Sequence, residues 1–224
     1  MKPDLYDISP ALTPDIAVFP SDTPMSREVL LDTAKGDALT LSSLHATCHL
    51  GAHVDGANHY GGAGGVDSWA LDRFLGRCQV VRADCPRGGR VEPAQLEDEI
   101  AEERLLIATG SWPDDSVFTK DYCGLSVALV EHMAARGVKT VGVDTPSVDT
   151  ADSKDLPAHH AILEADIAII EYLRLSDVPS GVYELIALPL KLKSTLSVAS
   201  QALGNLIDSG SPCSAFSEII GPPG

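Results

Sequence analysis

The stretch HATCHLGAHVDGANHY, residues 45–60, is the most informative part of this 224-residue chain. Its two glycines and the β-branched Val54 make a helix unfavourable, so we interpret it as the end of a strand covering residues 39–54. Side chains along a strand alternate between two faces. One face then carries His49, Gly51, His53 and Asp55, and the other carries Cys48, Leu50, Ala52 and Val54. The pattern predicts one apolar, buried face and one face of imidazole and carboxylate groups.

Imidazole and carboxylate groups are ligands for zinc and similar divalent ions. A lone histidine usually binds nothing, and hydrogen-bonded core or surface histidines are the alternative interpretation. Two histidines and an aspartate on one strand face favour a metal site instead. Cys48 lies next to a candidate ligand but belongs to the opposite face, so we expect it in the core.

Composition and charge exclude several classes of function. The chain has 16 basic and 32 acidic residues, a formal net charge of −16, which disfavours nucleic acid and anionic membranes as partners. It has no apolar run long enough to span a bilayer, no amino-terminal signal segment and no C-x-x-C pair among five cysteines. We therefore expect a cytoplasmic protein with reduced thiols. The absence of G-x-S-x-G disfavours a serine hydrolase.

Local periodicity predicts a layered α/β fold in a single domain, residues 1–224. Prolines break the first 24 residues into an irregular arm, and residues 194–224 form a loop-rich tail with a short helix at 197–207. Ser153 or Asp155 is the expected cap of the last main helix. The expected strands are 76–83, 104–109, 138–144, 167–173 and 183–192, and the expected helices are 92–103, 125–136 and about 155–165.

Two further candidate ligands lie in the second half of the chain. Glu171 interrupts the apolar run IAIIEYL, where a lone carboxylate is costly unless it is paired or metal-bound. Without a metal, it would pair with Arg174 or face solvent. His159 and His160 follow the predicted helix start, and the residues alone do not choose between them.

The spacing H-x-G-x-H-x-D-x-x-x-H, which runs from His49 to His59, resembles the signature of the metal-dependent cyclase-like amidohydrolases. Within that family the chain is most similar to the bacterial kynurenine formamidases. The resemblance covers nearly the whole length, including DISPALTPDIAVFPSDTP near the start, VGVDTPSVD at 141–149 and YELIALPLKL at 183–192. It implies a mixed β-sheet core with flanking helices, of the swivelling β/β/α type, with the first 24 residues covering the site. We also expect a homodimer.

The resemblance also implies roles for individual residues. Asp55 would bridge two divalent ions, zinc by expectation and manganese as a second suitable ion. The resemblance also favours His159 over His160 as a ligand, because the relatives place a histidine twelve residues before the glutamate. His59 would be the general base and acid. Phe19 would contact substrate or only pack, and Tyr60 would donate a hydrogen bond to substrate or only pack. The implied metal ligands are His49, His53, Asp55, His159 and Glu171.

The implied reaction is hydrolysis of an aryl formamide, N-formyl-L-kynurenine, to L-kynurenine and formate in tryptophan degradation. The chain departs from the relatives at Gly56-Ala57, where they carry Ala-Pro, and at residues 211–215, SPCSA, where they carry S-P-V-R-A. Because of these departures, a related amide, a lactam or an isatin-type ring is the alternative substrate. A non-catalytic metal or small-molecule binding protein, which would not need His59, is the alternative of another class.

Overall fold

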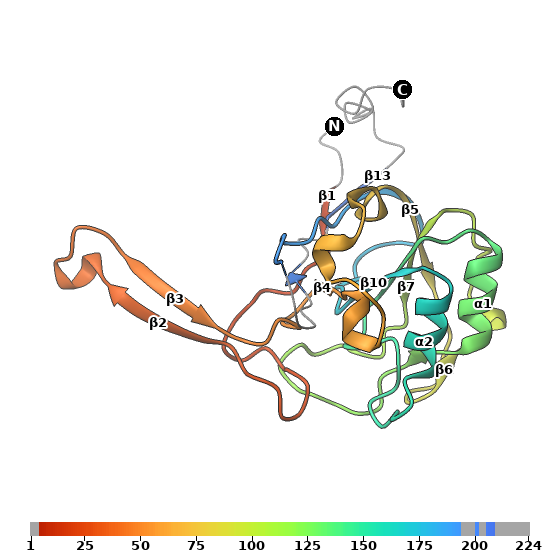
Figure 1. Cartoon of the computed structure of the whole chain (residues 1–224), viewed down its shortest axis with the longest axis horizontal. Helices are drawn as coiled ribbons and strands as arrows, with labels where there is room; N and C mark the ends of the chain where they lie inside the picture. Colours follow the sequence, from red (N-terminus) through yellow and green to blue (C-terminus); the bar gives the residue numbers. More distant parts are fainter. Residues whose placement is uncertain (1–4, 194–199, 202–204, 209–224) are drawn as a thin grey trace, which may run out of the picture.

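A mixed nine-stranded sheet forms the body of the computed structural model, which describes residues 5–193, 200–201 and 205–208 (Figure 1). The four central strands, β5, β7, β9 and β10, are parallel, and the outer pairs are antiparallel. In spatial order the strands are β1 (Leu5–Asp7), β13 (Asn205–Asp208), β11 (Gly181–Ile186), β5 (Leu75–Arg82), β7 (Arg104–Ala108), β9 (Thr140–Val143), β10 (Ala168–Glu171), β4 (His53–Val54) and β12 (Ser200–Gln201).

Strands β7, β9 and β10 are mainly apolar on both faces because both faces are covered. Helices α1 (Val127–Ala135) and α2 (Pro157–Glu164) lie side by side over one face (Figure 1), where Leu105 and Ile107 pack. Leu106, between them, packs on the opposite face with Phe74. The predicted mixed α/β fold with flanking helices is therefore confirmed. Among the described residues, neither helix has the length and apolar composition to cross a membrane.

The two main helices begin in different ways. The side chain of Ser126 accepts a hydrogen bond from the backbone N–H of Leu129 at 3.0 Å and caps α1, and Gly137, with φ of 77°, follows the helix end. Helix α2 instead starts after Leu156, which has a left-handed φ of 42° and makes no capping bond through its side chain. The expected cap at Ser153 or Asp155 is therefore wrong, while Pro157 does occupy the first turn.

Two predicted helices are wrong. Residues 92–103 form only a 3-10 turn, Pro93–Gln95, after which Leu96 is extended and bridges to Ala83. The acidic residues that follow place like charges at helical spacing, which disfavours a longer helix. Residues 197–207 contain strands β12 and the start of β13; the other residues of that predicted helix, 197–199 and 202–204, lie outside the described part of the chain.

The strand predicted over 39–54 is divided in two. Its first half, β3 (Leu41–His45), pairs with β2 (Ser26–Leu31) in a hairpin that stands away from the body, and only β4 joins the main sheet (Figure 1). The chain turns between them at Gly51, where φ is 61° and a Cβ would lie 2.6 Å from Leu12 Cδ2. Leu50, Ala52 and Val54 are buried as predicted, but Cys48 is exposed on the turn, so its expected place in the core is wrong.

Short elements complete the described part of the chain. Strands β6 (Arg90–Val91) and β8 (Gly124–Leu125) form a small parallel pair. Leu125 N of this pair donates a hydrogen bond to Val148 O, in the segment before α2, at 2.7 Å. The remaining 3-10 turns are Thr33–Lys35, Ala57–Tyr60, Val66–Ser68 and Leu71–Phe74.

Candidate metal centre

The five predicted ligands meet in one place, although they come from separate segments. His53 on β4 is directly opposite Glu171 on β10 in the antiparallel register. Asp55 follows β4 and donates its backbone N–H to Ile169 O at 3.2 Å. His49 comes from the turn before β4, and His159 from the first turn of α2. His160, the neighbouring alternative, is exposed.

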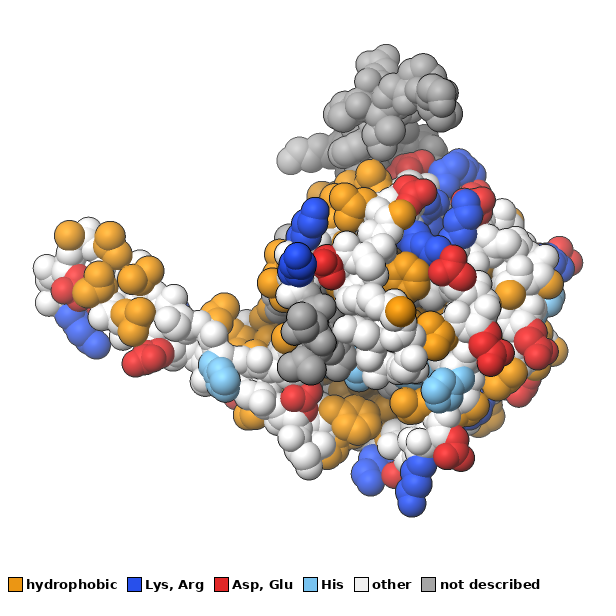
Figure 2. Space-filling model, viewed as in Figure 1, with side chains coloured by type: hydrophobic (Ala, Val, Ile, Leu, Met, Phe, Trp, Pro, Cys, Tyr) orange, Lys and Arg blue, Asp and Glu red, His pale blue; other side chains and the backbone are white. Residues whose placement is uncertain are grey.

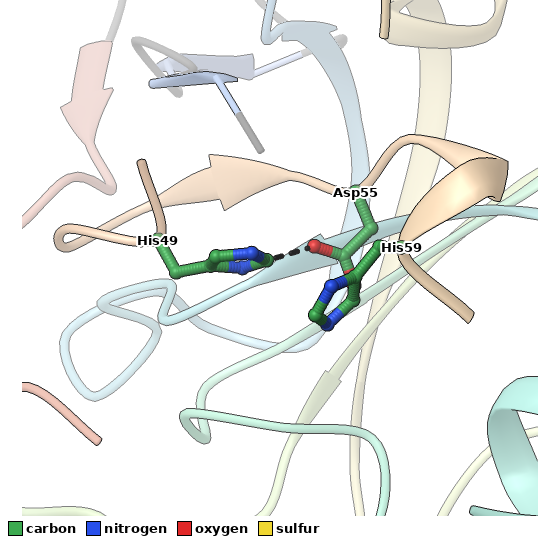
Figure 3. A group of neighbouring side chains, drawn as sticks. All are labelled: His49, Asp55 and His59. Carbon is green, nitrogen blue, oxygen red and sulfur yellow. Dashed lines mark ion pairs between the residues drawn. The ribbon is translucent and has the colours of Figure 1, made fainter. Parts of the chain in front are cut away.

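Asp55 is at the centre of this group. Its Oδ1 lies 3.4 Å from His49 Nδ1 and 3.5 Å from His53 Nε2, while its Oδ2 lies 3.7 Å from His159 Nε2. Figure 3 shows the His49 and His59 rings next to this carboxylate. Asp55 is fully buried, and neither of its oxygens has a hydrogen-bond partner within the described chain. A buried carboxylate in that state is costly, so the arrangement fits bound cations.

Two of the imidazoles are held with their Nε2 atoms directed at the carboxylates. His53 Nδ1 lies 2.8 Å from Gly51 O, and a carbonyl only accepts, so Nδ1 carries the proton. His53 Nε2 then faces Glu171 Oε2, 3.3 Å away, and lies 3.1 Å from His49 Nδ1. His159 Nδ1 donates to Asp149 Oδ2 at 2.8 Å in the same way. This is how metal-binding histidines are oriented in proteins.

Asp149 is a site residue that the sequence reasoning missed. It is buried, and its Oδ2 also accepts the backbone N–H of His159 at 3.1 Å. Its Oδ1 accepts a hydrogen bond from Arg90 Nη1 at 2.7 Å. Asp149 ends the segment VGVDTPSVD, but no spacing in the sequence links it to a histidine ten residues later. The link depends on how the chain folds back onto α2.

The charges of the site favour a positive occupant. Burial opposes ionisation of Asp55, yet the His159 and His49 imidazoles hold its pKa well below the usual value. Burial also lowers the pKa of His159, but its hydrogen bond to Asp149 and the carboxylates of Asp55 and Glu171 raise it to about 10. Without an ion, protonated imidazoles balance the charge of the carboxylates, and a divalent ion would displace the imidazole protons.

Glu171 is buried, and its Oε1 accepts the backbone N–H of Val148 at 2.8 Å. The alternative in which it pairs with Arg174 or faces solvent is wrong, because Arg174 instead pairs with Asp115 at 3.5 Å. The next residue, Tyr172, has a φ of 64°, which is strained for a non-glycine residue. The chain therefore turns sharply just after this carboxylate.

A pocket of about 400 Å³ opens beside the centre, a size typical of small-molecule sites. Residues 17–22 of the irregular arm line it, together with His49, His59, His159, Glu171 and Tyr172. Phe19 is 44% exposed and makes an edge contact with Phe118 at 5.1 Å between ring centroids. Burial lowers the pKa of His59, against the opposing charge of Asp55.

Tyr60 lies behind the pocket rather than in its lining. Its side chain is buried, and its ring centroid is 5.2 Å from that of His159. Its hydroxyl has no hydrogen-bond partner among the described residues. This position corresponds to the packing alternative for Tyr60, against the back of a candidate ligand.

Comparison with known proteins gives consistent matches. Residues 6–150 match the Cyclase family model, described as "Putative cyclase". Kynurenine formamidase of Bordetella pertussis is 39% identical over 192 residues, 84% of this chain and 91% of that protein. A potential metal-dependent hydrolase with cyclase activity superposes with a TM-score of 0.77 at 23% identity, covering 93% of this chain and 99% of that one. Isatin hydrolase A of Labrenzia aggregata, bound to benzyl benzoate, superposes with a TM-score of 0.74 at 20% identity, covering 91% of this chain and 93% of that one.

Proposed function

The chain belongs to the cyclase family, and from this membership we propose that it is a hydrolase of N-formyl-L-kynurenine, which it cleaves to L-kynurenine and formate. Similarity to kynurenine formamidase over most of both chains supports this substrate. The observation that carries the chemistry is Asp55, a buried carboxylate without hydrogen bonds among three imidazoles and a second carboxylate. That donor set suits a hydrolytic metal centre next to a pocket for a small aryl amide.

Two divalent ions, zinc or alternatively manganese, would be held by the five ligands. The two oxygens of Asp55 support a bridging role, since Oδ1 faces His49 and His53, and Oδ2 faces His159. Glu171 would be a ligand beside both groups, since its Oε1 lies 3.8 Å from His159 Nε2 and its Oε2 lies 3.3 Å from His53 Nε2. When bound, such ions supply Lewis acidity that polarises a carbonyl and lowers the pKa of water towards about 7.

His59 is the proposed general base and acid. It lines the pocket, and its ring centroid lies 4.3 Å from that of His49 and 6.2 Å from that of His159. A ring nitrogen of His59 takes a proton from the attacking water and returns it to the aniline nitrogen as the C–N bond breaks. Water adds to the formyl carbon, formic acid leaves with the added oxygen and ionises to formate, and the amine leaves with the proton that His59 returns.

The pocket wall supports recognition of an aromatic substrate. Phe19 and Tyr172 both line the pocket, and the Tyr172 hydroxyl donates to Ala17 O at 3.1 Å, which attaches this wall to β10. Aromatic side chains make favourable edge or stacked contacts with an aryl ring. We assign Phe19 to the substrate on this basis. Tyr60 is assigned to packing against His159.

The cellular setting is proposed from composition and family. We place this enzyme in the cytoplasm, as one domain over residues 1–224 that acts as a homodimer on a small molecule, without nucleic acid or membrane as partner. The net charge of −16 supports the exclusion of anionic partners. Residues 211–215, where the relatives carry an arginine, lie outside the described residues, and the substrate assignment makes no use of them.

A comparison of kcat/KM on N-formylkynurenine, N-formylaniline and isatin tests the substrate. N-formylkynurenine is expected to be the best substrate, because a site built for polar substrate groups discriminates strongly against analogues that lack them. Equal rates on N-formylaniline would show that the amino-acid end is not recognised. Preference for isatin would assign the site to ring-opening hydrolysis. Metal binding without turnover of any of the three would favour the non-catalytic binding protein.

Elemental analysis of protein purified without chelators tests the metal centre separately. We expect about two divalent ions per chain, as in two-metal hydrolytic sites. A Glu171→Ala variant is expected to lose one of them. A count of one or less in the unmodified protein, unchanged by added zinc, would contradict the bridging role of Asp55.

A further inference from the structure

Asp22 is an acidic side chain on the wall of the pocket beside the candidate metal centre. It ends the lining segment 17–22 and faces the same pocket as His49 and His59. The side chain is half-buried and forms no ion pair with any residue that the structure describes. It is not one of the five proposed ligands, and the proposed proton transfer does not use it. A carboxylate in this position attracts a cationic group of a bound molecule.

The basic side chains that follow Asp22 in the sequence are directed elsewhere. Arg27 Nε donates to Ser42 Oγ at 3.0 Å, across the β2–β3 hairpin. Lys35 belongs to the turn at the hairpin tip, and Figure 2 shows Lys or Arg side-chain atoms on the outer part of the hairpin, away from the body. The lining of the pocket, as far as the chain is described, contains neither Lys nor Arg. A cationic group of the substrate can therefore take the place that a basic side chain fills in an ion pair.

A tight turn places Phe19 and Asp22 next to each other. Asp22 N donates to Phe19 O at 2.9 Å, which closes a four-residue turn with Pro20 and Ser21 at its centre. The first and last Cα atoms of such a turn are less than about 7 Å apart. In N-formylkynurenine a short aliphatic chain joins the aryl ring to the α-ammonium group. An aryl ring in contact with Phe19 therefore brings this ammonium group towards the Asp22 carboxylate.

The turn has a strained backbone at Ser21. The φ of Ser21 is 77°, in the left-handed region that favours glycine at the third position of a turn. Strain of this kind is usually found where it serves binding or catalysis. Leu156 and Tyr172, which also have positive φ, line the same pocket. The shape of this wall is therefore imposed by the fold around the pocket.

The Asp22 carboxylate is itself oriented by hydrogen bonds. Its Oδ1 accepts the backbone N–H of Thr23 at 2.7 Å, and its Oδ2 accepts the Thr47 hydroxyl at 2.5 Å. The Thr47 hydroxyl in turn accepts the backbone N–H of His49 at 3.2 Å. An ionised carboxylate has about four lone-pair sites, so it can still accept from an ammonium group. A group that is oriented before binding loses less conformational freedom when substrate binds.

We propose that Asp22 binds the α-ammonium group of the substrate and makes the enzyme selective for aryl formamides that carry an α-amino-acid group. This inference rests on the proposed hydrolysis of N-formylkynurenine. It is carried by the position of Asp22 on the pocket wall, next to Phe19 and without a cation from the described chain. N-formylaniline and isatin have no ammonium group, so they cannot make this contact. A site with a polar group for the substrate discriminates against analogues that lack its partner.

The test compares kcat/KM on N-formylkynurenine with kcat/KM on its des-amino analogue, in which a hydrogen atom replaces the α-ammonium group. The unmodified protein is expected to prefer N-formylkynurenine. Asp22→Asn keeps the shape of the side chain but removes its charge, and it should lower this preference by about 10–100-fold, the usual effect of losing a hydrogen bond to a charged group. Circular dichroism and metal content verify that the variant is folded and loaded.

Two control variants separate the charge of Asp22 from its other contacts. Thr47→Val removes the hydroxyl that Asp22 accepts but keeps the carboxylate, so it should leave the preference between the two compounds unchanged. If Asp22 served only to anchor the arm, both variants would lower kcat/KM on the two compounds by equal factors. Asp15→Asn removes the same charge from an exposed position of the arm outside the pocket lining, and it should also leave the preference unchanged.

An Asp22→Asn variant with the preference of the unmodified protein would overturn the inference. An unmodified protein that cleaves both compounds with equal kcat/KM would overturn it as well, and that measurement needs no variant. Neither result contradicts the proposed function, since N-formylkynurenine is still hydrolysed. Absence of turnover of N-formylkynurenine by the metal-loaded unmodified protein would instead overturn the proposed function, and this inference with it.

Discussion

At the scale of single residues, the contact between Asp149 and His159 sets the orientation of a proposed ligand. A carboxylate that accepts the Nδ1 proton of an imidazole fixes its tautomer and increases the basicity of Nε2. Asp149 is itself held by Arg90, which donates to Leu125 O at 2.8 Å as well as to the carboxylate. Arg90 thus positions Asp149, and Asp149 in turn orients the His159 imidazole.

Replacing Asp149 by asparagine should weaken metal binding by about 10–100-fold, the usual cost of removing such an outer partner. The amide keeps the shape but has only one oxygen for donors that now use two, His159 and Arg90. Competition with a chelator measures the affinity. Asp152→Asn is the control, because Asp152 is exposed and pairs only with Lys120 in the described structure. Equal affinities for both variants would remove Asp149 from the site.

His59→Ala is expected to lower kcat by about 10²–10⁴, the span of general acid–base catalysis, while the metal content stays unchanged. The nearby exposed His160 provides the control, and His160→Ala should keep full activity. A nitrogen of His59 lies close enough to ligand atoms of His49 and Asp55 to share a metal with them. Loss of metal from the His59 variant would therefore make His59 a ligand instead of the base.

At the scale of elements, the β6–β8 pair supports the segment that carries Asp149. A Cβ added at Gly124 on β8 would lie 2.8 Å from Thr150 N and 2.9 Å from the carbonyl carbon of Asp149. Both atoms belong to the backbone, so a Cβ fits at Gly124 only if residues 148–150 move. Gly124 is thus required by close approach of two chain segments rather than by its own φ.

Gly124→Ala should destabilise the protein by roughly 1–3 kcal/mol, the usual cost of overpacking, and lower Tm by about 2–12 °C for a chain of this size. It should also weaken metal binding, because Asp149 shifts. Gly137→Ala makes the comparison specific: φ there is 77°, but no atom lies within 4 Å of the added Cβ. That control is expected to lose stability with unchanged metal affinity. Equal metal affinities in both variants would contradict the coupling.

At the scale of the whole molecule, metal binding should stabilise the fold, because the ligands come from the turn before β4, β4 itself, α2 and β10. Ligand at about 100 times its Kd adds about 2.7 kcal/mol, which corresponds to roughly 5–11 °C in Tm at this chain length. Thermal unfolding with and without a chelator measures it. Asp55→Asn should abolish the difference. Equal Tm values for the chelated and zinc-loaded unmodified protein would mean that the site does not hold zinc.

The sequence predicted features that depend on neighbouring residues. The strand at 104–109 was found because apolar residues are continuous where both faces of a sheet are buried. The spacing around Asp55 identified the candidate ligands because metals select residue types that a sequence displays directly. Glu171 was recognised because a carboxylate inside an apolar strand requires a compensating partner.

The tertiary structure decided what depends on contacts between distant segments. Periodicity could not show that His49 lies outside the sheet, since the chain turns at Gly51, where Leu12, far earlier in the chain, leaves no room for a Cβ. It could not pair Asp149 with His159, because their contact depends on the path of the chain into α2. Nor could it show the bridge from Leu96 to Ala83, which extends the chain within the segment predicted as a helix. Side-chain pattern records local preference, whereas burial and partners are properties of the folded chain.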